Sequence, residues 1–259
     1  MAFVTSLLTS ANPLPLLAWT TGYFLLIYCT FAGLAWTLAR LVGRPLETRA
    51  VDDRQVCTEV LNSLRSIVLF GTGILVPWSM IQIGLTTVDG EAGIVRIIAE
   101  CLVLVLWNDL HFYAMHRLLH EKLKKSHVAH HRSIAATPFA SYSMSATEAL
   151  LLGSVMPLAM LVHAFSVEAL LFLPVWSIFI NTLSHSNCDL FPRADEHSLL
   201  GFIRHHQTHH SRYHGNYGFF FGRLDRWLGT SSRPQHEKRI IHDSIQSRVY
   251  HPYSRVSAG

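Results

Sequence analysis

The spacing of apolar and polar residues divides the chain into long uncharged runs and a polar remainder. Residues 15–39 contain no charged side chain and exceed the roughly 20 apolar residues that a membrane-spanning helix needs. A second apolar run covers about 66–88, and a third covers about 93–115, with Arg96 and Glu100 near its start. The pattern therefore predicts three spanning helices in the first half of the chain.

A longer apolar run, residues 147–184, exceeds the length of one crossing. Within it, Ser166 and Glu168 have the pattern of a helix start, a capping hydroxyl followed by an acidic first turn. We therefore expect a helical hairpin with its tip near 163–167, followed by a polar and histidine-rich segment, 185–259. The predicted class is all-α: an integral membrane protein of about four spanning or hairpin helices with a cytoplasmic histidine-rich helical cap.

Charged residues are distributed asymmetrically around these runs. Five arginines lie between the first two runs, whereas Asp89 and Glu91 lie between the second and third. A second basic group, which includes Arg117, Lys122 and Lys125, follows the third run. Because loops rich in Lys and Arg stay on the cytoplasmic side, we expect the N-terminus outside and all histidine clusters inside.

Composition supports a membrane protein. Half of the 259 residues are hydrophobic and only 15% are charged, against about 25% in soluble proteins. The net charge is +4, but no Lys/Arg track is interleaved with aromatic residues, so nucleic acid is not an expected partner. The four cysteines form no Cys-x-x-Cys pair and are expected to be reduced packing residues. The cysteines are Cys29, Cys57, Cys101 and Cys188.

Histidines are concentrated in three groups with helical spacing, His-x3-His once and His-x2-His-His twice. Residues three and four apart share a helix face, and neutral imidazole is a ligand for iron, copper and zinc. Eight ligands are too many for one ion but enough for two. The alternative is a solvated polar face, which three groups on one side of a membrane disfavour. The eight are His116, His120, His127, His130, His131, His206, His209 and His210.

These segments resemble a known family. HRLLH (116–120), HVAHH (127–131) and HQTHH (206–210) are similar to the histidine motifs of the fatty acid hydroxylase and sterol desaturase superfamily. The resemblance covers roughly residues 95–230. It implies a catalytic domain over 93–232, preceded by N-terminal transmembrane helices in 1–92 and followed by a polar tail, 233–259.

Other segments carry the same resemblance. Asp109 stands in the family's lead-in to the first histidine motif, and Glu148 follows the second motif at the usual distance. HSNCDLFP (185–192) and NYGFFFGRLDRWLGT (216–230) resemble two further family segments, although Leu224 stands where a Trp is usual.

The resemblance implies a membrane-embedded di-iron oxygenase. Two iron ions and the co-substrate O2 would attack a C–H bond of a lipid, giving an alcohol or an alkene. The implied ligands are the eight histidines together with His185, whose alternative role is to hold a neighbouring ligand in place. Zinc can occupy such a site adventitiously.

Two carboxylates are candidate catalytic residues. Asp109 lies seven positions before His116, so it should share the ligand face and accept an N–H from a ligand histidine. Its alternative is a cap, or an ion pair with Arg117 or Lys125. Glu148 begins an apolar helix near the second motif, and we expect it to support a ligand rather than act as a plain first-turn acid.

Several polar residues are expected outside the site. Asp225 is expected to pair with Arg223 or Arg226. His111 and His205 should point away from the ligand faces of their helices. The remaining histidines expected outside are His163, His197, His236, His242 and His251, while His214 is left open.

Partners and location follow less directly. A sterol, fatty acyl chain, carotenoid or aminolipid could be the substrate. No flavin, haem or cysteine-cluster motif is present, so a separate donor is expected, a ferredoxin or cytochrome b5 with its reductase. The C-terminus lacks a retrieval signal, which favours a bacterial inner membrane over the endoplasmic reticulum. The alternative functions are a membrane haem protein and a zinc-handling protein without oxygenase activity.

Overall fold

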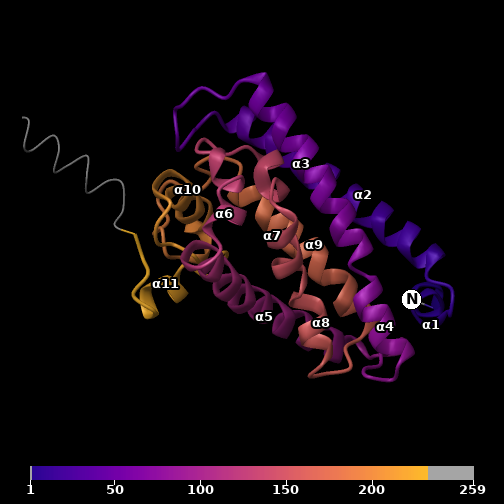
Figure 1. Ribbon diagram of the computed structural model, residues 1–259. Coiled ribbons are helices and arrows are strands. Elements are labelled where there is room, and N and C mark those ends of the chain that lie inside the picture. Colours follow the sequence, from indigo (N-terminus) through magenta and orange to yellow (C-terminus); the bar gives the residue numbers. More distant parts are fainter. Residues whose placement is uncertain (1, 233–259) are drawn as a thin grey trace, which may run out of the picture.

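A computed structural model describes residues 2–232, which contain helices and loops but no β-strand (Figure 1). The long helices are α2 (Leu14–Val42), α3 (Asp53–Thr72), α5 (Ile94–Glu121) and α9 (Val167–Ser184). The shorter ones are α1 (Ala2–Thr9), α4 (Leu75–Gln82), α6 (Lys124–His127), α7 (Ala146–Gly153), α8 (Val155–Met160), α10 (Phe202–Arg212) and α11 (Arg223–Trp227). Three 3₁₀ turns complete the set: η1 (His130–Arg132), η2 (Pro138–Tyr142) and η3 (Leu199–Gly201). The predicted all-α class is confirmed, while the predicted tail, 233–259, lies outside the described residues.

Three helices of the described chain are long and apolar enough to cross a membrane: Leu14–Val42, Asp53–Gln82 and Val167–Ser184. The chain is therefore a multi-pass membrane protein. The first predicted span is confirmed. The second begins earlier than predicted, because Asp52 accepts the backbone N–H of Gln55 at 2.8 Å and caps a helix that starts in polar sequence. The expected third span lies within α5, which is not among the three.

The charged residues at the start of α5 meet the tip of the predicted hairpin. Arg96 donates to Glu100 at 2.8 Å, and Glu100 accepts the backbone N–H of Ser166 at 2.7 Å. The Ser166 hydroxyl in turn accepts the backbone N–H of Ala169, so it caps α9 as the sequence predicts. These contacts confirm the turn between α8 and α9 and join it to α5.

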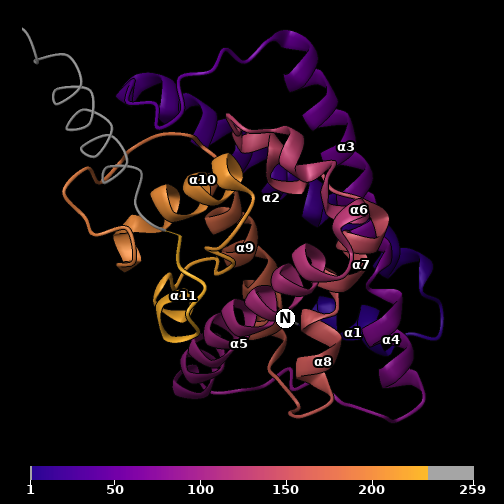
Figure 2. The same cartoon turned by 60° about the vertical axis from the view of Figure 1, so that its left-hand side comes forward.

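Helices α2 and α3 lie side by side in both views (Figures 1 and 2). They approach each other closely at Gly71, where a Cβ atom would lie 2.8 Å from the Cα of Thr21. The hydroxyl of Thr20 also donates to the carbonyl of Gly71 at 3.1 Å. Glycine at position 71 therefore lets the two backbones meet.

Helix α9 runs through the centre of the bundle and packs against α2, α5 and α10. Helices α1 and α4 lie at one end of the bundle and α10 at the other (Figures 1 and 2). The loop after α2 also reaches the α10 end, because Asp189 donates its backbone N–H to Arg44 and Leu46 donates to Asn187. Both the loop after α2, which holds Arg44 and Arg49, and the histidine-rich segments are thus at one end of the molecule.

Candidate metal centre

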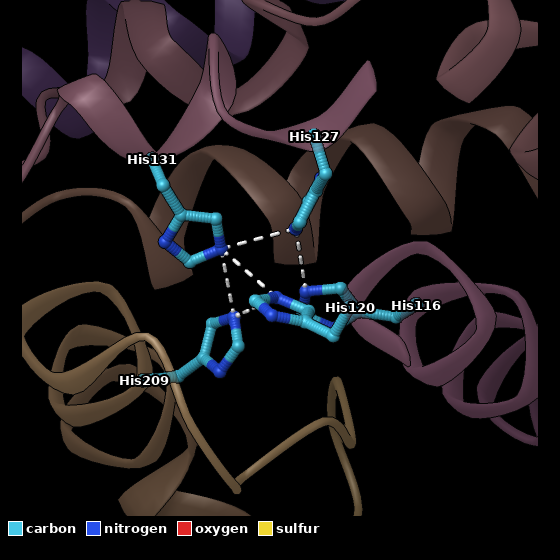
Figure 3. Close-up of side chains that lie close together, drawn as sticks. All are labelled: His116, His120, His127, His131 and His209. Carbon is cyan, nitrogen blue, oxygen red and sulfur yellow. Dashed lines mark hydrogen bonds between the residues drawn. The ribbon is translucent and has the colours of Figure 1, made fainter. Parts of the chain in front are cut away.

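The nine histidines predicted as ligands come together in two groups, and all are buried. Within each group, the candidate ligand atoms lie within 4.8 Å of one another. The first group, drawn in Figure 3, contains His116, His120, His127, His131 and His209. The second group contains His130, His185, His206 and His210.

Two segments, 127–131 and α10, contribute histidines to both groups. Helix α5 contributes only to the first group, and the end of α9 contributes only to the second. Helix α10 supplies His209 to the first group and His206 and His210 to the second. The middle segment does not form the single helix face that the spacing predicts, because α6 ends at His127 and the next turn begins at His130. His130 lies in the second group, while His127 and His131 lie in the first.

Hydrogen bonds fix the ring tautomer of most of these histidines. When the Nδ1–H of a ring donates to an acceptor, the Nε2 atom keeps its lone pair for a metal. Five rings donate Nδ1–H to a backbone carbonyl: His116 to Tyr217 (2.9 Å), His130 to Ser143 (3.3 Å), His185 to Asn181 (2.8 Å), His209 to Gly215 (2.7 Å) and His210 to Ser133 (3.1 Å).

The Nε2 atoms of each group then converge on one another. Nε2 of His185 lies 3.1 Å from Nε2 of His210, although both rings use their Nδ1–H elsewhere. Two facing lone pairs repel each other unless a cation lies between them. Ligands about 2.1 Å from a first-row ion lie roughly 3.0–3.4 Å apart, which matches the 3.0–3.2 Å Nε2–Nε2 distances in both groups. The residues therefore fit metal ions.

Burial lowers the pKa of all nine histidines, because a charged imidazolium would lose its hydration. The pKa falls to about 3 for His127 and His209 and to about 4 for His130. The rings are therefore neutral at physiological pH, which is the form that binds a metal.

The predicted contact of Glu148 with a ligand is confirmed. Its Oε1 accepts the Nδ1–H of His127 at 2.9 Å, and both side chains are buried. The hydroxyl of Ser145 accepts the backbone N–H of Glu148 and so places the carboxylate at the start of α7. A carboxylate on the far side of a ligand imidazole makes that ring a stronger donor to a metal.

The expected contact of Asp109 with a ligand histidine is wrong. Its Oδ1 accepts the backbone N–H groups of Phe220 and Phe221, at 2.7 and 3.2 Å. The alternative pairing with Arg117 is also wrong, since Arg117 donates to Glu121 at 2.7 Å. Asp109 therefore ties the segment after α10 to α5.

Asp225 was expected to pair with an arginine, and it pairs with His205 instead, at 3.0 Å. It also accepts the backbone N–H groups of Tyr217 and Gly218 and the hydroxyl of Thr230. Burial alone would raise the pKa of Asp225, but the hydrogen bonds lower it below its usual value. This carboxylate braces the loop that carries two of the carbonyls facing the ligand rings.

The other histidines of the described chain lie outside both groups, as expected for all of them except His214, which was left open. His111 contacts Ser154 at 2.9 Å, and the half-exposed His163 contacts Glu100 at 2.9 Å. His214 is exposed. His197 was expected at the surface, but it is half-buried against the ring of His205. His236, His242 and His251 lie outside the described residues.

Comparison with known proteins adds the deciding observation. The family model described as fatty acid hydroxylase matches residues 101–230, half of the chain. The chain belongs to the fatty acid hydroxylase family. The match spans all nine candidate ligands.

The relatives of this fatty acid hydroxylase family member include proteins named as sterol desaturases and as a cholesterol hydroxylase. A Delta(7)-sterol 5(6)-desaturase of Schizosaccharomyces pombe is 28% identical over 89% of the chain and 76% of its own length. A cholesterol 25-hydroxylase of Rattus norvegicus is 31% identical over 56% of the chain and 51% of its own length. Of a second Delta(7)-sterol 5(6)-desaturase, from Eremothecium gossypii, the chain spans 41%. No solved structure matches the chain.

Aromatic residues around the histidines of this family member were not predicted. The rings of Tyr213 and Tyr217 lie 4.8 and 5.1 Å from the ring of His120. Tyr213 adopts a left-handed backbone conformation at the end of α10, with φ of 66°. The sequence signal for this turn was the Arg-Tyr-His-Gly run (212–215) after the third histidine motif, because glycine is common just beyond a helix end.

An apolar cavity of about 290 Å³ lies among α3, α4, α5, α7, α8 and α9. Phe112 and Phe219 form part of its wall, and their rings stack 4.5 Å apart. The same two rings face the ligands, because Phe112 lies 4.9 Å from His116 and Phe219 lies 6.4 Å from His206. One layer of side chains thus separates the cavity from the histidines of the two groups.

Proposed function

We propose that this protein is a membrane-bound non-haem di-iron oxygenase that hydroxylates or desaturates a C–H bond of a lipid. The main support for this proposal is the pair of histidine groups. Within each group, Nε2 lone pairs face one another at distances that suit the ligands of a cation. Two groups with separate ligands suit two ions rather than one. Family membership and the named relatives indicate an oxidoreductase that acts on lipids.

Iron ions bound by these groups would supply the activation of O2 and the removal of hydrogen from carbon. The chain's own residues then have defined tasks. The nine neutral imidazoles hold the ions, the backbone carbonyls and Glu148 orient the rings, and Tyr213 and Tyr217 exclude water. The apolar cavity beside Phe112 and Phe219 would hold the lipid next to the centre.

Relatives named as a desaturase and as a hydroxylase both resemble this chain, so the likeness supports the shared chemistry and does not choose between the two outcomes. The two reactions differ only in whether oxygen is added after the first hydrogen is removed or a second hydrogen leaves.

We further propose that electrons come from a separate carrier, a ferredoxin or cytochrome b5 with its reductase. The supporting observation is basic surface at the histidine end, where Lys124 and Arg132 are exposed. Such a surface favours an acidic partner. A cytoplasmic position of this end is supported by Arg44 and Arg49, which lie in the loop beside the 185–192 segment.

A haem protein is the first alternative. A haem ligated by a pair of histidines needs two imidazoles separated by the thickness of a ring system with iron at its centre. The Nε2 atoms here lie 3.0–3.2 Å apart and leave no space for a macrocycle. A zinc-handling protein is the second alternative, and it is distinguished by the metal that supports turnover.

The test uses purified full-length protein in lipid nanodiscs. We expect about two iron ions per chain, no haem absorbance band, and a lipid product that has gained one oxygen atom or lost two hydrogen atoms. Turnover should require an added ferredoxin and reductase. Product formation with O2 and NADPH alone would contradict the separate donor, and full activity of a zinc-only protein would contradict the di-iron proposal.

A further inference from the structure

Three of the polar side chains that line the apolar cavity lie together on one side of it. Asn108 and His111 lie on α5, three residues apart and therefore on one face. Ser154 lies opposite them at the junction of α7 and α8, with its Oγ 2.9 Å from Nε2 of His111. The junction is held against α5 by Trp107, whose indole N–H donates to the carbonyl of Val155 at 2.8 Å.

The side-chain amide of Asn108 lacks hydrogen-bond partners in the described chain. Its side chain is 5% exposed, and it makes no hydrogen bond to any residue between 2 and 232. A buried amide without partners costs stability, so a polar group in the cavity next to it would be bound favourably. The amide offers both a donor, Nδ2–H, and an acceptor, Oδ1.

The hydrogen bonds of Ser154 decide the tautomer of His111. The single hydroxyl hydrogen of Ser154 goes to the carbonyl of Leu151 at 2.7 Å, so the Oγ atom must accept in its contact with His111. His111 therefore carries its hydrogen on Nε2. Its Nδ1 is then a lone-pair acceptor without a partner in the described chain.

The cavity also lacks any charge. None of the lining residues within the described chain is Asp, Glu, Lys or Arg. An ionised carboxylate or phosphate placed there would lose its hydration without a counter-charge. The ligand group that meets Asn108 and His111 must therefore be neutral.

We propose that Asn108 and His111 form a binding site for the hydroxyl group of a neutral lipid substrate. The hydroxyl donates to Nδ1 of His111 and accepts from Nδ2–H of Asn108, which uses both of its hydrogen-bonding functions. A carbonyl or an ether can only accept and would leave His111 unpaired. This inference rests on the proposed function, and it defines the substrate class as alcohols rather than acids or esters.

The site also positions the rest of the lipid. His111 precedes His116 by five residues, about 7.5 Å along the helix axis. A lipid anchored at His111 can extend along the cavity toward Phe112 and Phe219, next to the metal-binding rings. The oxidised carbon is then expected at a fixed distance from the hydroxyl, because the anchor and the histidines lie on the same helix.

The test measures binding without turnover. Iron-loaded protein in nanodiscs is kept under argon without reductant, and competition for bound lipid is measured in two series of probes. One series is cholesterol, its methyl ether, 5-cholestene and cholesteryl sulfate. The other is 1-hexadecanol, hexadecane and palmitate. In at least one series, the alcohol should bind about tenfold tighter than each of its analogues.

Substitutions then locate the preference. Asn108→Leu and His111→Phe should each reduce the preference for the alcohol to near unity while leaving the affinity for the hydrocarbon and the iron content unchanged. Ser154→Ala should weaken the preference partly, because it frees the His111 tautomer. The matched control is Ser79→Ala, since Ser79 makes the same contact to a carbonyl three residues earlier but lies outside the cavity.

Two results would overturn the inference. One is equal binding of alcohol and hydrocarbon in both series, and the other is a preference that survives Asn108→Leu and His111→Phe. Neither result depends on oxidation. If cells make an oxidised lipid but the protein does not prefer the alcohol, this inference fails and the proposed function stands. If the protein prefers the alcohol but no oxidised lipid is made, the hydroxyl-binding site stands and the proposed function fails.

Discussion

Individual imidazoles differ in how replaceable they are, because the first group holds five ligands and the second holds four. His130→Ala leaves three ligands in the second group, and we expect bound iron to fall from about two ions per chain to about one. His209→Ala leaves four in the first group, so more metal should remain. Activity should be lost in both variants, since each ring shapes its ion's surroundings. Elemental analysis and product formation measure the two effects.

His163→Ala is the control for these two variants. His163 is half-exposed, contacts Glu100 near the start of α5, and belongs to neither group. It should keep its iron and most of its activity. Equal iron loss in His163→Ala and His130→Ala would contradict the assignment of ligands.

Glu148 gives a second prediction at this scale. Glu148→Gln keeps the size of the side chain but removes the charge that accepts the Nδ1–H of His127. We expect iron affinity or activity to fall about 10–100-fold, the usual cost of losing a partner of a ligand histidine. Glu121→Gln is the matched control, because Glu121 pairs with Arg117 at the surface. A Glu148→Gln protein with normal iron affinity and rate would show that the contact is only structural.

Single residues were predictable where chemistry alone decides their role. The histidines could be found because imidazole at helical spacing has few other uses on a membrane protein. Asp109 could not be assigned in this way. Its partners are backbone N–H groups more than a hundred positions away, at Phe220 and Phe221, and a helical projection contains only neighbours on the same helix.

Helices α2 and α3 depend on one glycine for their close contact. Gly71→Ala places a Cβ atom 2.6–2.8 Å from Thr21, including its backbone, so one helix must shift. We expect a loss of about 1–3 kcal/mol in the free energy of unfolding. Gly33→Ala in α2 is the control, since nothing lies within 4 Å of its Cβ position. Alanine there should be neutral or stabilising by up to about 1 kcal/mol.

Thermal unfolding of both variants in detergent measures this difference. A Gly71→Ala protein as stable as Gly33→Ala would mean that α2 and α3 are less closely packed than the structure describes.

Elements were predictable where hydrophobicity alone defines them, as in α2 and the hairpin of α8 and α9. The start of α3 was missed because its first turns are polar, and a cap at Asp52 rather than an apolar run begins it. The break after His127 was missed because histidine spacing suits a helix whether or not the backbone continues as one. The hydrophobic pattern alone marks neither a helix cap nor a break in the backbone.

The whole molecule has two ends, and topology can be tested there. Glu91 lies in the exposed loop between α4 and α5, and Lys124 is exposed at the histidine end. In a cysteine-free background, Glu91→Cys should react with an impermeant maleimide in intact cells. Lys124→Cys should react only after the membrane is permeabilised, because basic loops stay inside. The reverse pattern would place the proposed metal centre outside.

Family and class were accessible at this scale, and the division into domains remains a prediction. The α2 and α3 helices precede the matched region, 101–230, yet Ser63 of α3 donates to the carbonyl of Phe139 at 2.6 Å. Composition could not reveal such contacts, because any apolar helix is compatible with any apolar neighbour in a membrane.

The distribution of α10 ligands between both groups has a consequence for biosynthesis. A nascent chain that has emerged only as far as residue 200 carries four rings of the first group and two of the second. Neither group is then complete, although the three helices of residues 2–232 that are long and apolar enough to cross a membrane have already been translated. These helices can therefore insert before either ligand set is complete. A ribosome stalled before His206 yields a product that carries these helices but lacks both complete histidine groups.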